Sequence, residues 1–174
     1  RNDVRALLDA NALRPRRSLG QNFLVDPNTA RRIVRLAGID ASSNVLEIGP
    51  GLGSLTLALA DTAARVLALE VDERLVNVVR EVAHDAPNVE IVHGDALEWS
   101  YDANLGDAEW TCVSNLPYNV ATPVVIRLLE GARGVMRVLV MVQREVGERL
   151  AAAPGSSSYG AVSVKVAYHG EARG

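Results

Sequence analysis

The sequence lacks the features that stabilise disulfide-rich secreted proteins and those that anchor proteins in membranes. Its single cysteine, Cys112, cannot form an internal disulfide bond and lies within an apolar run, which predicts a buried structural thiol. No apolar stretch is long enough to span a bilayer, and the first residues show no secretory signal pattern. We therefore expect a cytoplasmic protein without a membrane partner.

Histidine and aromatic residues are also scarce. The three histidines, His84, His93 and His169, show no metal-ligand spacing, and no Ser/His/Asp arrangement is recognisable. We therefore expect neither a metal centre nor a hydrolase triad. Aromatic residues make up 4% of the chain, so a Tyr or Trp outside an apolar run is a candidate functional residue.

Charge is distributed unevenly along the 174 residues. The net charge of -3 argues by itself against a nucleic-acid partner. Residues 1–37, however, contain eight Arg and three Asp, which gives +5, whereas the remainder has ten Lys or Arg and eighteen Asp or Glu, which gives -8. This asymmetry predicts a basic arm on an acidic body, although an Arg-rich solvated helix face explains the charge equally well.

The first forty residues predict two helices separated by a basic loop. Apolar spacing indicates a helix at residues 3–13, and residues 14–25 form a loop that contains glycine and arginine. Asp26 is the expected N-cap of a second helix that runs to about Leu36, with proline at its first position. Gly38 would end this helix.

From residue 44 onward, short apolar runs alternate with helical patterns. We expect buried strands at residues 45–48, 66–69, 89–92, 110–113 and 138–142. We expect helices near residues 52–62, 73–83, 122–129 and 144–152. A sixth run of the same kind, residues 159–168, follows a flexible Pro/Gly/Ser-rich segment at 154–158. The alternation predicts an α/β fold with a doubly wound, mainly parallel sheet, in which ligands bind at the carboxyl ends of the strands.

A glycine-rich loop follows the first strand, in residues 47–56 (EIGPGLGSLT). Its glycines allow a sharp turn and close approach to a ligand, and the next helix presents its N-terminal amides. Ser54 stands where a dinucleotide fingerprint has its third glycine, which argues against a nicotinamide dehydrogenase. A ligand with a carboxylate and a ribose fits better. The alternative is that the glycines serve only helix–strand packing.

Acidic residues follow the second and third strands. Glu70 can accept hydrogen bonds from both ribose hydroxyls, whereas Asp72 is the expected cap of the next helix, although the two could exchange roles. Asp95 can accept from an exocyclic amino group such as that of adenine. Each acid alone could be a solvated loop residue. Together with the glycine loop, they predict an adenosine derivative with an amino-acid tail, S-adenosylmethionine.

The fourth strand ends in the sequence Asn115-Leu116-Pro117-Tyr118. An aromatic amine is a poor nucleophile, because its lone pair is delocalised into the ring. The Asn115 side-chain oxygen and the Leu116 carbonyl can accept hydrogen bonds from the two N–H groups of this amine. Pro117 would fix the turn, and Tyr118 offers a ring that can stack on a base. Outside this context, a turn with a satisfied Asn and a buried Tyr would be the simpler interpretation. We expect Asn119 and Thr122 to cap the following helix, and Gln143-Arg144-Glu145 either lines the pocket or starts a helix.

These motifs resemble the ribosomal RNA adenine dimethyltransferases of the KsgA type. The resemblance covers nearly the whole chain and includes residues 18–24 (SLGQNFL), 47–56, 70–72, 94–97, 115–123 (NLPYNVATP), 143–146 and 159–160. It implies a Rossmann-like class I S-adenosylmethionine-dependent methyltransferase that dimethylates two adjacent adenosines in the 3′-terminal hairpin of small-subunit rRNA during assembly. The implied partner is this RNA or the pre-30S particle, and we expect a monomer.

The resemblance also implies roles for individual residues. The cofactor site would comprise Gln21, Asn22, Leu24, Gly49, Gly51, Glu70, Asp95, Ala96 and Asn115. The first three would lie beside the methionine end of the cofactor, and Asn115 would contact both cofactor and target amine. Tyr118 would stack on the target adenine. The Arg14, Arg16 and Arg17 cluster would lie near RNA phosphate.

Members of this family continue into a seventh strand and a small helical domain, whereas this sequence ends at Gly174. We therefore expect a basic arm and contact loop at residues 1–43 and a catalytic domain at residues 44–174 that is truncated before the last strand. We expect this piece to bind the cofactor, with RNA methylation weak or absent. The closest alternative function is the large-subunit adenine methyltransferase of macrolide resistance. Another is a non-catalytic assembly factor. A protein-amide methyltransferase is disfavoured, because its target would not require the basic arm.

Overall fold

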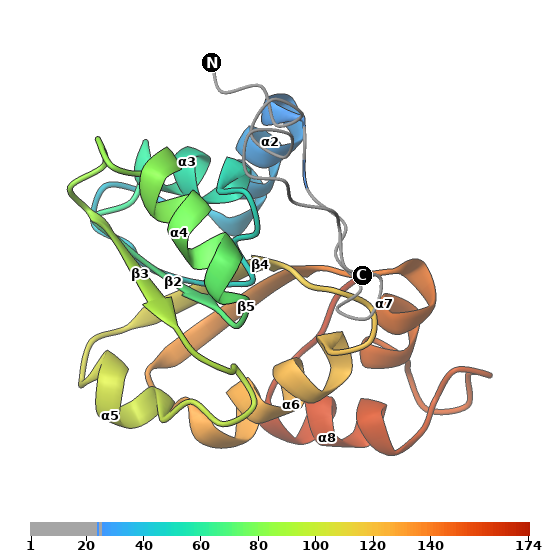
Figure 1. Ribbon diagram of the computed structural model, residues 1–174. Coiled ribbons are helices and arrows are strands. Elements are labelled where there is room, and N and C mark those ends of the chain that lie inside the picture. Colours follow the sequence, from blue (N-terminus) through green and yellow to red (C-terminus); the bar gives the residue numbers. More distant parts are fainter. Residues whose placement is uncertain (1–23, 25) are drawn as a thin grey trace.

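The computed structural model describes residue 24 and residues 26–174 (Figure 1). In this part of the chain, five strands form one parallel sheet with the order β3-β2-β1-β4-β5. The strands are β1 (Asn44–Ile48), β2 (Arg65–Glu70), β3 (Val89–His93), β4 (Trp110–Asn115) and β5 (Val135–Met141). Because the chain reverses its direction of winding between β1 and β4, these two strands flank the switch point at which ligands bind in such sheets.

Helices cover both faces of the sheet. The described helices are α2 (Pro27–Ala37), α3 (Ser54–Ala60), α4 (Glu73–Val82), α5 (Tyr101–Leu105), α6 (Ala121–Gly131), α7 (Arg144–Leu150) and α8 (Ala161–His169). Figure 1 shows α2, α3 and α4 on one side of the sheet and α5, α6 and α8 on the other. Alternate residues of β1 point into the helical layers on the two faces of the sheet. Val45 packs with α2 and α3, and Leu46 packs with α5 and α6. The α/β, doubly wound prediction is confirmed.

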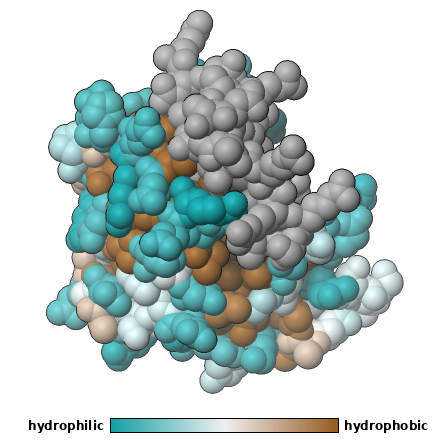
Figure 2. All heavy atoms as spheres, viewed as in Figure 1, coloured by the Kyte–Doolittle hydropathy of each residue, from teal (hydrophilic) through white to brown (hydrophobic). Residues whose placement is uncertain are grey.

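All five predicted strands between residues 44 and 142 are present, and the predicted helices differ from the observed ones by a few residues at their ends. Asp26 caps α2, because its carboxylate accepts from the backbone amides of Asn28 and Thr29 at 3.0 and 3.1 Å. Gly38 ends the helix with a left-handed φ of 63°. The surface in Figure 2 shows apolar side chains between hydrophilic ones on the face that Figure 1 presents.

The sixth apolar run is a helix, not the strand that we expected. Alternating valines in residues 159–168 suit a strand locally, but the segment forms α8 and buries Ser163 and Val166, three positions apart, against its neighbours. The Ser163 hydroxyl donates to the carbonyl of Arg149 on α7 at 2.8 Å. Packing against α6 and α7 therefore overrides the local preference.

The start of α6 also differs from expectation. We expected caps from Asn119 and Thr122, but α6 begins at Ala121, with Val120 as an N-cap that makes no side-chain capping bond. The amides of Val120 and Ala121 instead donate to the carbonyl of Pro117 at 3.2 and 3.0 Å. The turn after β4 thus leads into the helix through hydrogen bonds of its own backbone.

Candidate functional site

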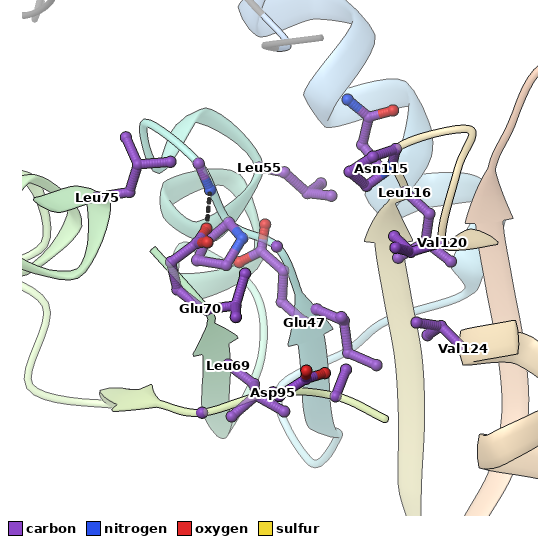
Figure 3. A pocket seen from close by; sticks show the side chains of 18 of the residues that line it. Glu47, Leu55, Leu69, Glu70, Leu75, Asp95, Asn115, Leu116, Val120 and Val124 are labelled. Atoms are coloured by element: carbon purple, nitrogen blue, oxygen red, sulfur yellow. Dashed lines mark hydrogen bonds between the residues drawn. The ribbon is translucent and has the colours of Figure 1, made fainter. Parts of the chain in front are cut away.

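A pocket lies at the carboxyl ends of the central strands (Figure 3). Its volume of about 210 Å³ is more than ten times the space that one ordered water needs, so it can hold an organic ligand. Figure 3 shows Glu47 and Glu70 on neighbouring strands, with Asn115 and Leu116 across the pocket. The pocket brings together many of the residues predicted from the sequence: Leu24, Gly49, Gly51, Glu70, Asp95, Ala96, Asn115, Leu116 and Pro117.

The glycine-rich loop is fastened to β2. The amide of Gly49 donates to the carbonyl of Leu69 at 2.9 Å, and the amide of Gly51 donates to Glu70 Oε2 at 3.2 Å. Gly53 has a φ of 81°, and a Cβ there would lie 3.0 Å from a methyl group of Val79. The loop is therefore both a tight turn and a close contact with α4, so the packing interpretation of its glycines is partly correct.

Glu70 is a buried carboxylate that organises two loops. Oε2 accepts from Gly51, and Oε1 accepts from the amide of Asp72 at 3.0 Å. Burial raises the pKa of Glu70, while these backbone hydrogen bonds act in the opposite direction. Each carboxylate oxygen can accept a further bond, so the group can still bind hydroxyls in the pocket. Asp72 caps α4 through the amide of Arg74, as expected.

The loop after β3 is held by the side chain of Asp95 and by two residues of other elements. Asp95 Oδ1 accepts from the amide of Leu97 at 2.8 Å, which closes a tight turn. The Tyr101 hydroxyl donates to the carbonyl of Ala96 at 2.8 Å. Arg127 of α6 donates from Nε to the carbonyl of Leu97 at 3.1 Å. The rim of the pocket at Asp95 is therefore preorganised.

The turn after β4 lies between the pocket and a neighbouring groove. The amide of Leu116 donates to the carbonyl of Met141 on β5 at 3.0 Å, which fixes the end of β4. Asn115 and Leu116 line both the pocket and the groove. Tyr118 lines only the groove and is 52% exposed, so its ring is open to a partner and is not the buried Tyr of the simpler interpretation. Gln143 also lines the groove, and the next residue begins α7.

Sequence reasoning missed Glu47 as a site residue. Its carboxyl group lines the pocket although it is 1% exposed, and Oε2 accepts from the Thr56 hydroxyl at 2.6 Å. Burial raises its pKa to about 8, despite the Thr56 hydrogen bond, and the charge of Glu70 adds to the rise. The available signal was a charged residue inside the apolar run 45–48.

Some predictions fall outside the described residues. They are the helix at residues 3–13, most of the loop at residues 14–25, and the site residues Gln21, Asn22, Arg14, Arg16 and Arg17.

Among the described residues, no group of three or more His, Cys, Asp or Glu side chains could hold a metal ion. None of the described helices has the length and apolarity needed to cross a membrane. Cys112 is buried, as predicted, and burial raises the pKa of its thiol to about 12.

The sequence is similar to known proteins along almost its full length. The family model for ribosomal RNA adenine dimethylase matches residues 12–173. Ribosomal RNA small subunit methyltransferase A of Leifsonia xyli is 47% identical over 173 residues, which are 97% of this chain and 61% of that protein. The protein of the same name from Mycobacterium avium is 47% identical over 178 residues, which are 99% of this chain and 56% of the relative. The chain thus spans about three fifths of the length of these relatives.

Solved structures agree with this similarity. A dimethyladenosine transferase from Plasmodium falciparum superposes with a TM-score of 0.72 at 29% identity, and the match covers 84% of this chain and 52% of that one. The 23S rRNA methyltransferase ErmE superposes with a TM-score of 0.66 at 31% identity, over 77% of this chain and 53% of the other.

Proposed function

The chain belongs to the ribosomal RNA adenine dimethylase family, and we propose that it supplies the cofactor-binding and methyl-transferring part of a small-subunit rRNA adenine-N6 dimethyltransferase. The observation that carries this proposal is the convergence of the glycine loop, Glu70, Asp95 and the Asn115–Leu116 turn on one pocket. We further propose that it acts as a monomer in the cytoplasm, on small-subunit RNA within an assembling particle. Residues 44–174 would form the catalytic domain and residues 1–43 the basic arm.

The pocket residues fit S-adenosylmethionine in chemical type. Glu70 is a buried acceptor suited to ribose hydroxyls, and Asp95 lies on the rim where an adenine amino group can donate to it. Leu97 and Val124 provide apolar wall for a purine ring, and the turn at Gly51 leaves room for a methionine tail. The bound cofactor supplies an electrophilic methyl group on a sulfonium. The protein supplies position and electrostatics.

The turn after β4 would prepare the target amine. The Asn115 side-chain oxygen and the Leu116 carbonyl accept hydrogen bonds from the two N6–H groups of the adenine. These hydrogen bonds draw the nitrogen lone pair out of conjugation with the ring. Pro117 restricts the backbone between them and the next residue. Tyr118, exposed beside this turn, stacks on an adenine that has left its helix. Neither a metal nor a covalent enzyme intermediate is needed for an in-line displacement.

One observation favours a second candidate function. The structural likeness to ErmE is close to that of the dimethyladenosine transferase, so methylation of large-subunit rRNA uses the same scaffold. The curated relatives at 47% identity carry the small-subunit name, which makes the small subunit our preferred substrate.

Transfer of a radiolabelled methyl group tests these alternatives. Unmethylated small and large subunits are offered separately to the chain, with an Asn115→Ala variant as the inactive control. We expect slow labelling of the small-subunit RNA only, with N6,N6-dimethyladenosine recovered after digestion. A chain that labels the large subunit preferentially supports the second candidate. A chain that does not bind S-adenosylhomocysteine in calorimetry contradicts both.

A further inference from the structure

We propose that the outer face of α2, formed by Arg31, Arg32 and Arg35, is a docking surface for the phosphate backbone of the substrate RNA. This inference rests on the proposed function, because it takes RNA to be the substrate. It assigns a role to a helix whose side chains do not line the cofactor pocket.

The geometry of α2 places its arginines together. The helix buries Ala30, Ile33, Val34 and Ala37 against the sheet and α3. At 100° per residue, Arg31, Arg32 and Arg35 lie on the opposite side of the helix, and all three are exposed. Arg31 and Arg35 are one turn apart, about 6 Å along the axis. The three guanidinium groups therefore form one compact basic face.

None of the acidic side chains that the structure describes forms an ion pair with this face. The sequence of α2, PNTARRIVRLA, contains no acidic residue. Asp26, immediately before it, is engaged by the amides of Asn28 and Thr29 and by the Thr29 hydroxyl. No ion pair between described residues includes the α2 arginines, whereas Arg65 and Arg133 each have a carboxylate partner.

This basic face contrasts with the net charge of the chain, which is -3. Like charges one helical turn apart repel each other, so the three arginines disfavour α2 unless an external anion lies on them. Guanidinium groups bind phosphate oxygens in a bidentate manner, and a polymer with regularly spaced phosphates satisfies several of them at once. RNA is the partner with this chemistry.

The face also lies at the correct place for a substrate strand. α2 begins close to the cofactor pocket, since Leu24, just before its cap, lines that pocket. Its last turn, at Leu36 and Ala37, lines the groove that Asn115 and Tyr118 share. α2 packs beside β4, the strand that ends in this turn (Figure 1). An RNA whose adenine stacks on Tyr118 can therefore extend its backbone onto α2.

Salt-dependent RNA binding tests this surface. The probe is a fluorescein-labelled RNA hairpin with two adjacent adenosines in its loop, titrated with the full 174-residue chain at several KCl concentrations. The test variant is Arg31→Gln/Arg32→Gln/Arg35→Gln, because Gln preserves helix propensity. The control, Arg65→Gln/Arg133→Gln/Arg173→Gln, changes the net charge equally but removes arginines that pair with carboxylates.

We expect the α2 variant to bind this hairpin on the order of tenfold more weakly, with a salt slope reduced by about 2, as the loss of up to three phosphate contacts requires. The control should retain the parent slope. The Arg31→Lys/Arg32→Lys/Arg35→Lys variant should also retain the parent slope, because the slope reports charge. Thermal unfolding checks that each variant is folded, and the single Arg31→Gln and Arg35→Gln variants provide a second series with smaller changes.

Calorimetric titration with S-adenosylhomocysteine separates this inference from the proposed function. If the parent binds this ligand and methylates RNA, but the α2 variant and the control have the same RNA affinity and slope, the docking surface is refuted and the proposed function stands. If the parent binds neither the ligand nor RNA, both fail. Loss of binding to phosphatidylglycerol vesicles in the α2 variant, with unchanged RNA binding, would also overturn the proposal.

Discussion

The Thr56 hydroxyl donates a 2.6 Å hydrogen bond to Oε2 of Glu47, and both residues are buried where β1 meets α3. This bond fastens the helix after the glycine loop to the strand before it. It also leaves an ionisable group in the wall of the pocket, with a pKa of about 8, because burial penalises its charged form.

The first prediction concerns the pH dependence of stability. The pKa of Glu47 rises from an ordinary 4.5 to about 8 on folding, so the folded protein holds a proton that the unfolded chain releases. The contribution of Glu47 to stability is therefore lost as pH rises from about 4.5 to about 8, with a slope of up to about 1.4 kcal/mol per pH unit.

A Glu47→Gln variant keeps the shape and cannot ionise, so its free energy of unfolding should fall less over this window. Urea unfolding between pH 5 and pH 9 measures the difference between the two proteins. Thr56→Val is the matched control, because it removes the hydrogen bond and retains the carboxyl. Parallel pH profiles for the parent and Glu47→Gln would show that Glu47 does not bind this proton.

The second prediction concerns the two acids at the strand ends. We expect Glu70→Gln and Asp95→Ala each to weaken S-adenosylhomocysteine binding by about 1.5–3 kcal/mol, the range for a hydrogen bond to a charged group. Gln is chosen at position 70 because it still accepts one backbone amide, which limits unfolding of the loop. Glu98→Ala, an exposed acid on the same loop as Asp95, should have no effect. Calorimetry that finds all three variants equal to the parent would place the cofactor elsewhere.

The third prediction separates binding of the target from binding of the cofactor. Tyr118 lies outside the cofactor pocket, so Tyr118→Ala should leave S-adenosylhomocysteine affinity unchanged. It should lower kcat/KM for RNA methylation by the equivalent of about 1–3 kcal/mol, because base stacking on the ring is lost. Tyr118→Phe retains the ring and should behave like the parent. Equal methylation by the Ala and Phe variants would remove stacking from the proposed mechanism.

Much of the site could be predicted from the sequence because its residues follow buried strands. In a parallel sheet, the carboxyl ends of neighbouring strands meet at one edge, so Gly51, Glu70, Asp95 and Asn115 had to converge once the strands were recognised. Local signals also sufficed for the cap of α2, where Asp26 precedes a proline.

The features that the sequence did not predict depend on tertiary packing. Valines alternate along the sequence of α8 as they do in a strand. The segment nevertheless forms a helix, through contacts with α6 and α7. α5 is five residues long, too short for a helical period, and is fixed by the buried Tyr101. The role of Glu47 depends on Thr56, nine positions away on another element. Arg127 acts on a loop thirty residues earlier in the chain.

The fourth prediction follows from that last contact. Arg127 donates to the carbonyls of Leu97 and Trp99 at 3.1 and 3.3 Å, and its guanidinium lies 5.8 Å from the centre of the Tyr101 ring. It therefore acts as a positioning residue for the loop that carries Asp95. Arg127→Met retains much of the length and removes both donors, so the loop should become less ordered.

The free energy of cofactor binding should then weaken by about 1–2 kcal/mol, which is the contribution of one or two ordinary hydrogen bonds. Because the loop would hold the adenine equally in the ground state and in the transition state, KM for S-adenosylmethionine should rise while kcat stays near the parent value. Arg133→Met is the matched control: it breaks a surface ion pair with Asp102 and does not touch this loop. A fall in kcat at constant KM would instead mean that Arg127 acts through α6 on the Asn115 turn.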